Sequence, residues 1–144
     1  MGSHKINRFI DTECIVVGAS LAAISAALEG ARRGNRTALV MHTNSPALEI
    51  GTSMGAWLTE SEAELMPENL RDALLTNAGG PTAGGTEPFR LLDQTIALTR
   101  IEDLLIDAGI SIFYGARPIG LLANDVDETT NAVGVLFGGK FGTA

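Results

Sequence analysis

Short apolar runs alternate with more polar, periodic stretches along the whole chain. The first run, Cys14–Gly18, is rich in β-branched residues and stops at a glycine, which predicts a strand buried on both faces. Residues 21–33 then carry apolar side chains at helical spacing, and Gly34 follows as a C-terminal cap. A second apolar run, Ala38–Met41, predicts another short buried strand. The pattern therefore predicts a strand, a glycine turn, a helix and a strand, in that order.

Such a βαβ unit is typical of dinucleotide-binding domains, whose turn carries the fingerprint G-x-G-x-x-G/A. Here the turn is Gly18-x-Ser20-x-x-Ala23. We expect Gly18 to supply the tight turn and Ala23 to let the helix approach the strand closely. Ser20 stands where glycine lets a pyrophosphate approach, so either its hydroxyl donates to a phosphate oxygen or its side chain holds the ligand off. The amides of Leu21 and Ala22 still offer an anion site at the helix N-terminus.

The second part of the fingerprint is an acid at the end of the second strand, which accepts a hydrogen bond from a ribose hydroxyl. His42 stands there instead, 24 residues after Gly18. A neutral imidazole accepts a hydrogen bond through one nitrogen, so His42 is a candidate for the same contact. Ser20 and His42 leave two interpretations open: a working site with altered residues, or a nucleotide-shaped domain whose site has decayed.

The middle of the chain is expected to be less regular. Residues 43–60 are turn-rich, and Ile50–Ser53 offers small residues and hydroxyls that fit beside a phosphate or a ring. Trp57 either caps this region or fills the core, and core packing is the commoner role of a tryptophan. Residues 60–78 predict one or two short helices, with Pro67 able to start the second.

A glycine-rich loop and a longer helix are expected next. Residues 79–88 hold four glycines and two prolines, which predicts a loop. A helix is expected over residues 89–108, with Gly109 ending it and Asp93 on its solvated face. Its apolar stripe is formed by Leu91, Leu92, Thr95, Leu98, Ile101, Leu104 and Leu105.

The last part of the chain predicts extended structure. Ile110–Tyr114 is expected to form a third buried strand. Residues 117–123 and 132–137 then predict a hairpin around an acidic turn, 124–131. The acids of that turn lack the spacing of a calcium loop.

Size and composition fit one small α/β domain. The chain has 144 residues, 45% of them hydrophobic and only 5% aromatic, which suits a parallel sheet covered by helices. Residues 1–10 are assigned to a tag remnant (MGSH) and an N-terminal arm, and residues 11–144 to the domain. The single cysteine, Cys14, is expected to be a small core residue, and no cluster of Cys and His indicates a metal site.

Charge and hydropathy exclude several classes of partner. The net charge of −7 and the lack of a basic run remove the electrostatic basis for binding nucleic acid or an anionic membrane. No apolar run reaches the length needed to span a bilayer. A cytoplasmic protein that binds a small molecule is therefore expected.

Four stretches of the chain resemble, in order and spacing, the N-terminal part of FAD-dependent oxidoreductases of the glutathione-reductase-like fold. They are CIVVGASLAAISAALEGARRGNRTALVMH, LEIGTSMGAW, LTRIEDLLIDAGISIFYGARPIGLL and NAVGVLFGGKFGTA. They are similar to the family's FAD-binding βαβ unit, its LGG segment, its helix with the third strand, and its hairpin. The resemblance implies a Rossmann-like FAD/NAD(P)-binding domain, with a parallel sheet, flanking helices and a C-terminal hairpin, incomplete as a single chain.

The resemblance also implies the residues that bind FAD. The pyrophosphate site falls on the βα turn, the ribose contact on His42, the LGG segment on Leu48–Thr52, and the adenine edge near Arg117–Ile119. The cofactor-binding set is Gly18, Ser20, Leu21, Ala22, His42, Thr43, Gly51, Thr52, Ser53 and Pro118. Pro118 lacks an N–H, so it cannot give adenine a two-sided backbone contact if it occupies the pairing position. No catalytic residue is assigned, and of this chain only Thr52, Ser53 and Trp57 are expected near a flavin.

The implied function is that of the FAD-binding portion of a flavin-dependent oxidoreductase acting on a small-molecule substrate. Family members continue with a further strand, a substrate domain and a return segment. The hypothesis that follows is a split or cleaved enzyme, in which a second polypeptide, either a separate subunit or a cleavage product, completes the fold. The alternative is a degenerate, non-catalytic subunit that stabilises or regulates a partner. An NAD(P)-binding domain of another enzyme class is disfavoured, because no arginine beside His42 awaits a 2′-phosphate.

Overall fold

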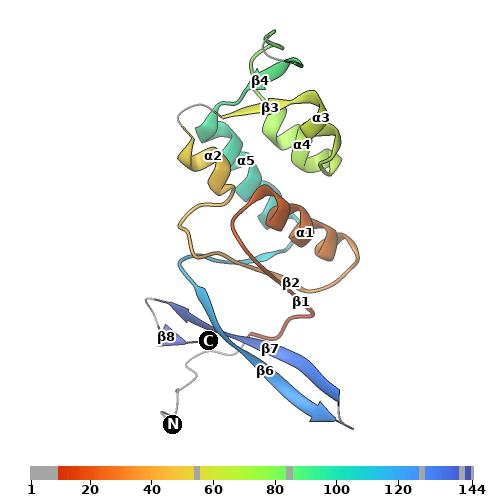
Figure 1. Cartoon of the computed structure of the whole chain (residues 1–144), viewed down its shortest axis with the longest axis vertical. Helices are drawn as coiled ribbons and strands as arrows, with labels where there is room; N and C mark the ends of the chain where they lie inside the picture. Colours follow the sequence, from red (N-terminus) through yellow and green to blue (C-terminus); the bar gives the residue numbers. More distant parts are fainter. Residues whose placement is uncertain (1–9, 54–55, 84–85, 127–128, 140–141, 144) are drawn as a thin grey trace.

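A computed structural model of the chain describes residues 10–53, 56–83, 86–126, 129–139 and 142–143. Its centre is a three-stranded parallel sheet in the order β1-β2-β5, formed by β1 (Cys14–Val17), β2 (Thr37–Val40) and β5 (Ser111–Phe113). Helix α1 (Leu21–Arg32) connects β1 to β2 and packs on both strands (Figure 1). The predicted α/β fold with a parallel sheet and a flanking helix is confirmed.

The two faces of this sheet have different neighbours, because side chains alternate along each strand. On one face lies α1: a Cβ added at Gly30 would sit 3.1 Å from Cys14 Sγ and 3.0 Å from the hydroxyl oxygen of Thr37. Ile15 and Val40 lie on the opposite face, toward the C-terminal hairpin. The middle strand, β2, is buried over its whole length.

β1 is less buried than the sequence predicts. Val17 is 47% exposed and Cys14 is only partly buried. Among the described strands β1 pairs with β2 alone, so its other edge is open. The expectation of a strand buried on both faces is therefore wrong for β1 and right for β2, since only β2 has a strand on either side.

The ends of α1 follow from its capping residues. Ser20 is the N-cap, with extended backbone angles of φ −81° and ψ 163°. At the other end the C-cap is Arg33, and Gly34 has a φ of 85°, a left-handed conformation that glycine adopts without strain. Between them, α1 buries Ile24 and Leu28 against the core.

The stretch expected to be turn-rich, 43–60, contains a helix and a strand. They are α2 (Leu48–Thr52) and β3 (Trp57–Thr59), and β3 pairs antiparallel with β4 (Phe89–Leu91). Trp57 is 62% exposed whereas Leu58 is 5% exposed. Core packing of Trp57 is therefore wrong, because alternation along β3 gives the buried face to Leu58.

Two short helices follow, as predicted for residues 60–78. They are α3 (Glu60–Glu64) and α4 (Glu68–Leu75), and Pro67 is the N-cap of α4. α3 begins with a capping box, in which Thr59 and Glu62 each bond the other's backbone amide. Leu70 and Leu74 of α4 are buried in the core.

The longest helix, α5 (Gln94–Asp107), begins later than the sequence predicts. Asp93 is its N-cap and accepts a hydrogen bond from the Ile96 amide at 3.0 Å. Because the helix starts at this cap, residues 89–91 form β4, and Asp93 is a cap and not part of a solvated helix face. Ile101 and Leu105 keep the predicted apolar stripe and are fully buried.

Asp93→Ala is expected to lower the free energy of unfolding by about 1 kcal/mol, because the first turn of α5 loses its side-chain acceptor. Urea denaturation of the purified chain measures this difference. The matched control is Asp103→Ala, since Asp103 is an exposed acid inside the same helix with no capping role. Equal midpoints for the two variants would contradict the assignment of the cap.

The chain ends in antiparallel structure at one end of the molecule, with β3, β4, α3 and α4 at the other (Figure 1). The strands are β6 (Arg117–Val126), β7 (Thr129–Gly139) and β8 (Gly142–Thr143). The predicted turn, 124–131, is too long, because backbone pairing continues to the Val126–Thr129 pair. Asp127 and Glu128 of that turn lie outside the described residues.

The described parts of the chain contain no helix that is long and apolar enough to cross a membrane. They also contain no group of three or more acids, histidines or cysteines that could hold a metal ion.

Candidate functional site

The turn from β1 into α1 has the geometry that the fingerprint requires. Gly18 has a φ of 148°, and its amide donates to the carbonyl oxygen of Val40 at 3.0 Å. A Cβ at Gly18 would sit only 3.0 Å from Ala23 Cβ. The strand and the helix therefore approach so closely here that a side chain at Gly18 would collide with Ala23. The expected roles of Gly18 in the turn and of Ala23 in the close contact fit this geometry.

Ser20 is turned toward the helix. Its Oγ accepts a hydrogen bond from the Ala23 amide at 3.2 Å and caps α1. Any residue can adopt the extended backbone conformation of Ser20. Glycine would therefore be required at this position only to make room for a ligand. Capping is a role that the two sequence-based interpretations of Ser20 did not include.

The first amide of α1 already has an acidic partner. The Leu21 N–H donates to Oε1 of Glu49, in α2, at 2.9 Å, while Ala22 is exposed next to it. Sequence reasoning missed Glu49, although it is the single acid between His42 and Glu60. The carboxylate stands where a helix N-terminus would otherwise hold an anion.

The remaining candidates of α2 are engaged within that helix. The Thr52 hydroxyl donates to the Leu48 carbonyl oxygen at 2.7 Å, and the Ser53 hydroxyl donates to that of Glu49. Gly51 is exposed, and a Cβ there would make only ordinary contacts, at 3.8 Å. These residues lie close to the βα turn because Glu49, in the same helix, bonds the Leu21 amide. Their hydroxyl groups donate to carbonyl oxygens of α2 itself.

His42 and Thr43 lie at the carboxyl end of β2. His42 is exposed, and its side chain makes no hydrogen bond to any described residue. The Thr43 hydroxyl donates to the Ser45 carbonyl oxygen at 2.8 Å, and the Thr43 carbonyl oxygen accepts from the Gly115 amide at 3.1 Å. The Gly18 amide bonds the carbonyl oxygen of Val40, so Val40 is the residue of β2 next to the βα turn. His42 follows Val40 by two residues.

Pro118 begins the hairpin near the same edge of the sheet. Ala116, two residues earlier, donates its amide to the Met41 carbonyl oxygen at 2.9 Å. Pro118 itself is exposed in β6 opposite Phe137, with an irregular register before Gly120. The candidates of the βα turn and of residues 42–53 therefore lie near the carboxyl ends of β1 and β2, where open α/β sheets bind ligands, whereas Pro118 lies in the hairpin.

Tyr114 is a titratable side chain at the end of β5 that the sequence did not single out. Its hydroxyl donates to Oε1 of Glu102, in α5. Partial burial and the Glu102 carboxylate both raise the pKa of Tyr114 above its ordinary value. The phenol therefore stays protonated near neutral pH and serves to tie β5 to α5.

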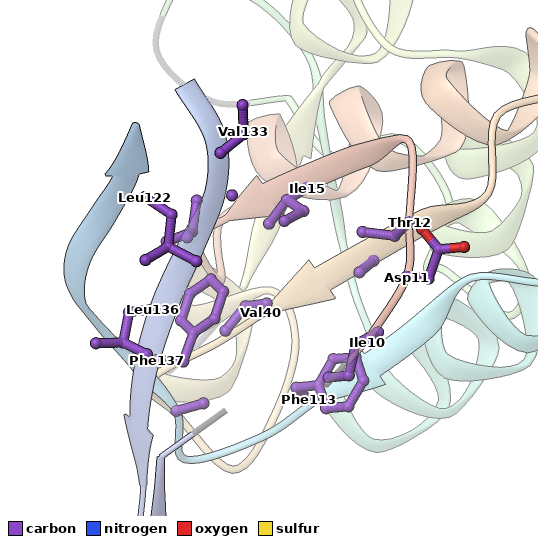
Figure 2. Close-up of a pocket in the computed structure, with 14 residues that line it drawn as sticks. Ile10, Asp11, Thr12, Ile15, Val40, Phe113, Leu122, Val133, Leu136 and Phe137 are labelled. Carbon is purple, nitrogen blue, oxygen red and sulfur yellow. The ribbon is translucent and has the colours of Figure 1, made fainter. Parts of the chain in front are cut away.

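An apolar cavity of about 180 Å³ lies on the other side of the sheet (Figure 2). Ile15, Val40 and Phe113 line it from the sheet, and Leu136 and Phe137 line it from β7. Its lining is mainly apolar, with Asp11 and Thr12 as the polar residues among those that form it, and it has no basic side chain to meet a dinucleotide phosphate. The candidate cofactor residues lie outside it.

Comparison with known proteins decides which family carries this geometry. None of the curated proteins matches the sequence. The family described as FAD dependent oxidoreductase matches residues 13–140. The chain belongs to this family. The resemblance inferred from the four stretches is thereby confirmed, and FAD is the cofactor that membership of the FAD-dependent oxidoreductases assigns to it.

Solved structures with this fold include several longer proteins. THI4 from Thermovibrio ammonificans is 18% identical with a TM-score of 0.65, over 89% of this chain and 48% of that protein. OxyS anhydrotetracycline hydroxylase from Streptomyces rimosus is 15% identical with a TM-score of 0.64, over 92% and 29%. Aklavinone-11 hydroxylase, solved with FAD and aklavinone, is 16% identical with a TM-score of 0.59, over 100% and 31%. The chain thus spans less than half the length of each of these three proteins.

The backbone of the βα turn fits a dinucleotide phosphate, and one side chain does not. The positive φ of Gly18 and its close contact with Ala23 are the features that such a ligand requires. The Glu49 carboxylate on the Leu21 amide is a negative charge where the phosphate would lie. The Leu21 amide is therefore already occupied by an acceptor in this structure.

Proposed function

We propose that this chain forms the FAD-binding part of a flavin-dependent oxidoreductase. The observation that carries the proposal is the family match over residues 13–140, together with the fingerprint geometry of Gly18 and Ala23. The redox chemistry belongs to the flavin when it is bound, whereas this chain supplies binding and orientation. A cytoplasmic location is part of the proposal and rests on the sequence alone.

The cofactor would lie along the carboxyl ends of β1 and β2. In the proposal the amides of Leu21 and Ala22 hold the pyrophosphate, and Ser20 caps the helix that presents them. His42, exposed and without a hydrogen-bond partner among the described residues, would accept from a ribose hydroxyl. Thr43, Gly51, Thr52, Ser53 and Pro118 would line the neighbouring surface.

A second part of the proposal concerns what completes the fold. The outer edge of β1 has no partner among the described strands, and Val17 on it is 47% exposed. Open strand edges favour pairing with another strand. We propose that further protein, from a second polypeptide in a split or cleaved enzyme, pairs with β1 and carries the substrate-binding groups for a small molecule.

The test is a visible absorption spectrum of the purified protein, with intact mass measured on the same sample. The expected result is a flavin spectrum and a second polypeptide alongside the 15.0 kDa chain. A flavin spectrum from a folded chain alone would support FAD binding and contradict the split enzyme. A colourless sample that takes up no added FAD would contradict the proposed function.

The double variant Ser20→Gly with His42→Glu separates a working site from a decayed one, because it restores the common fingerprint. If Ser20 and His42 are ligands adapted to this chain, the variant binds FAD no more tightly than the natural sequence. If FAD binds only to the variant, the chain is a degenerate, non-catalytic subunit.

A further inference from the structure

The contact between Glu49 and Leu21 places a carboxylate of the protein at an amide that the proposed cofactor would also need. The amide of Leu21 is the first of α1, and its hydrogen bond to Glu49 Oε1 is 2.9 Å long. Amides at this position carry the positive end of the helix dipole and attract anions. In the free chain a carboxylate of the protein itself takes the place of the phosphate.

Helix α2, which carries Glu49, is fastened to the rest of the molecule at both ends. The Leu48 amide donates to the Ala19 carbonyl oxygen at 2.9 Å, directly beside the βα turn. At the other end, Gln94 Nε2 donates to the carbonyl oxygen of Ile50 at 2.9 Å and also to that of Ser53. Ile50 is buried between these two attachments. The backbone of Glu49 is therefore held over the first turn of α1.

The side chain of Glu49 is free to leave although its backbone is not. It is exposed, and among the described residues its carboxylate makes this one hydrogen bond and no ion pair. No basic side chain of the described residues thus forms an ion pair with this carboxylate when a diphosphate approaches the same amide. Two anionic groups cannot share one N–H, so binding of the phosphate requires Glu49 to swing out.

We infer that Glu49 is an intramolecular competitor for the diphosphate of the cofactor. It caps α1 when the site is empty, is displaced when the dinucleotide binds, and thereby sets the affinity of the chain for FAD. This inference rests on the proposed function for the identity of the ligand. It deepens that function by assigning a specificity role to a residue outside the family fingerprint.

Glu49→Gln tests the inference, because the amide side chain keeps the size of glutamate and loses its charge. FAD and inorganic pyrophosphate are titrated separately against the purified protein by calorimetry. The expected result is about tenfold tighter binding of FAD, the difference made by one charge-assisted hydrogen bond and the repulsion that goes with it. The control is Glu64→Gln, an exposed acid in α3 that is expected to leave both affinities unchanged.

Thermal stability distinguishes competition from a structural role. As a competitor, Glu49 stabilises the free chain, so Glu49→Gln lowers the melting temperature while it raises the affinity. A residue that merely supports the fold would lower both. The amide resonance of Leu21 in a ¹⁵N-labelled sample supplies a readout without any ligand, and it is expected to shift in Glu49→Gln and not in Glu64→Gln.

Each outcome separates this inference from the proposed function. Equal FAD affinity in the natural chain and Glu49→Gln, or an unshifted Leu21 resonance, overturns the competitor and leaves FAD binding intact. Pyrophosphate binding that tightens in Glu49→Gln, without FAD binding in either protein, supports the competitor and overturns the proposed function. Failure of both ligands to bind any variant overturns both.

Discussion

Gly18→Ala is expected to lower the free energy of unfolding by about 2–4 kcal/mol and to abolish FAD binding. Two costs add at this position. A φ of 148° is strained for any residue with a Cβ, and that Cβ would sit 3.0 Å from Ala23 Cβ. Because α1 must move away from β1 to make room, its first amides leave the position at which they would meet a phosphate. Urea denaturation and FAD titration measure the two effects.

Gly34→Ala is the matched control for this substitution. Gly34 also has a positive φ, 85°, but a Cβ there would meet nothing within 4 Å. Its cost is therefore strain alone, about 1 kcal/mol, with no displacement of α1 from the sheet. Equal losses of stability in the two variants would show that the contact between Gly18 and Ala23 is not tight.

Leu105→Ala is expected to destabilise the chain by about 3 kcal/mol, within the range for removing a buried leucine side chain. Leu105 lies in α5 with 0% of its surface exposed, packed in the core that α1 and α4 share with the sheet. The missing methyl groups leave a cavity that the surrounding helices cannot fill completely. The midpoint of urea denaturation reports this loss.

The adjacent residue provides the control. Ile106 is an apolar residue of the same helix, but it is 63% exposed. Ile106→Ala is expected to change stability by less than about 0.5 kcal/mol. A loss for Ile106→Ala as large as that for Leu105→Ala would mean that another protein covers this face of α5 in the purified sample.

Local signals in the sequence account for the correct part of the fold prediction. The strand, turn, helix and strand at residues 14–41 were predictable because their boundaries carry glycines: Gly18 ends the first strand at the turn, and Gly34 follows the helix. The helix pair around Pro67 and the end of α5 at Gly109 follow in the same way. These features depend on residues within one or two turns of each other.

The errors of prediction fall where one local pattern allows two structures. The apolar residues Leu91 and Leu92 continue the helical spacing of α5, but Asp93 caps the helix after them and leaves residues 89–91 to pair with β3. Trp57 is exposed because its neighbour Leu58 takes the buried face of that strand. The pairing of β3 with β4 decided both cases, and its paired residues lie at least 30 positions apart in the chain.

The sequence by itself determined the family, the parallel sheet with its helix, and the turn built by Gly18 and Ala23, because all of these are written in short-range spacing. Only the tertiary structure brought Glu49 to the Leu21 amide, a contact between residues 28 positions apart. It also directed the hydroxyls of Thr52 and Ser53 to carbonyl oxygens of their own helix, and it left β1 with β2 as its one partner among the described strands. The physical reason is that the electrostatic environment of a helix N-terminus depends on which side chains pack against it. Those side chains can come from distant parts of the chain, so local residue spacing does not predict them.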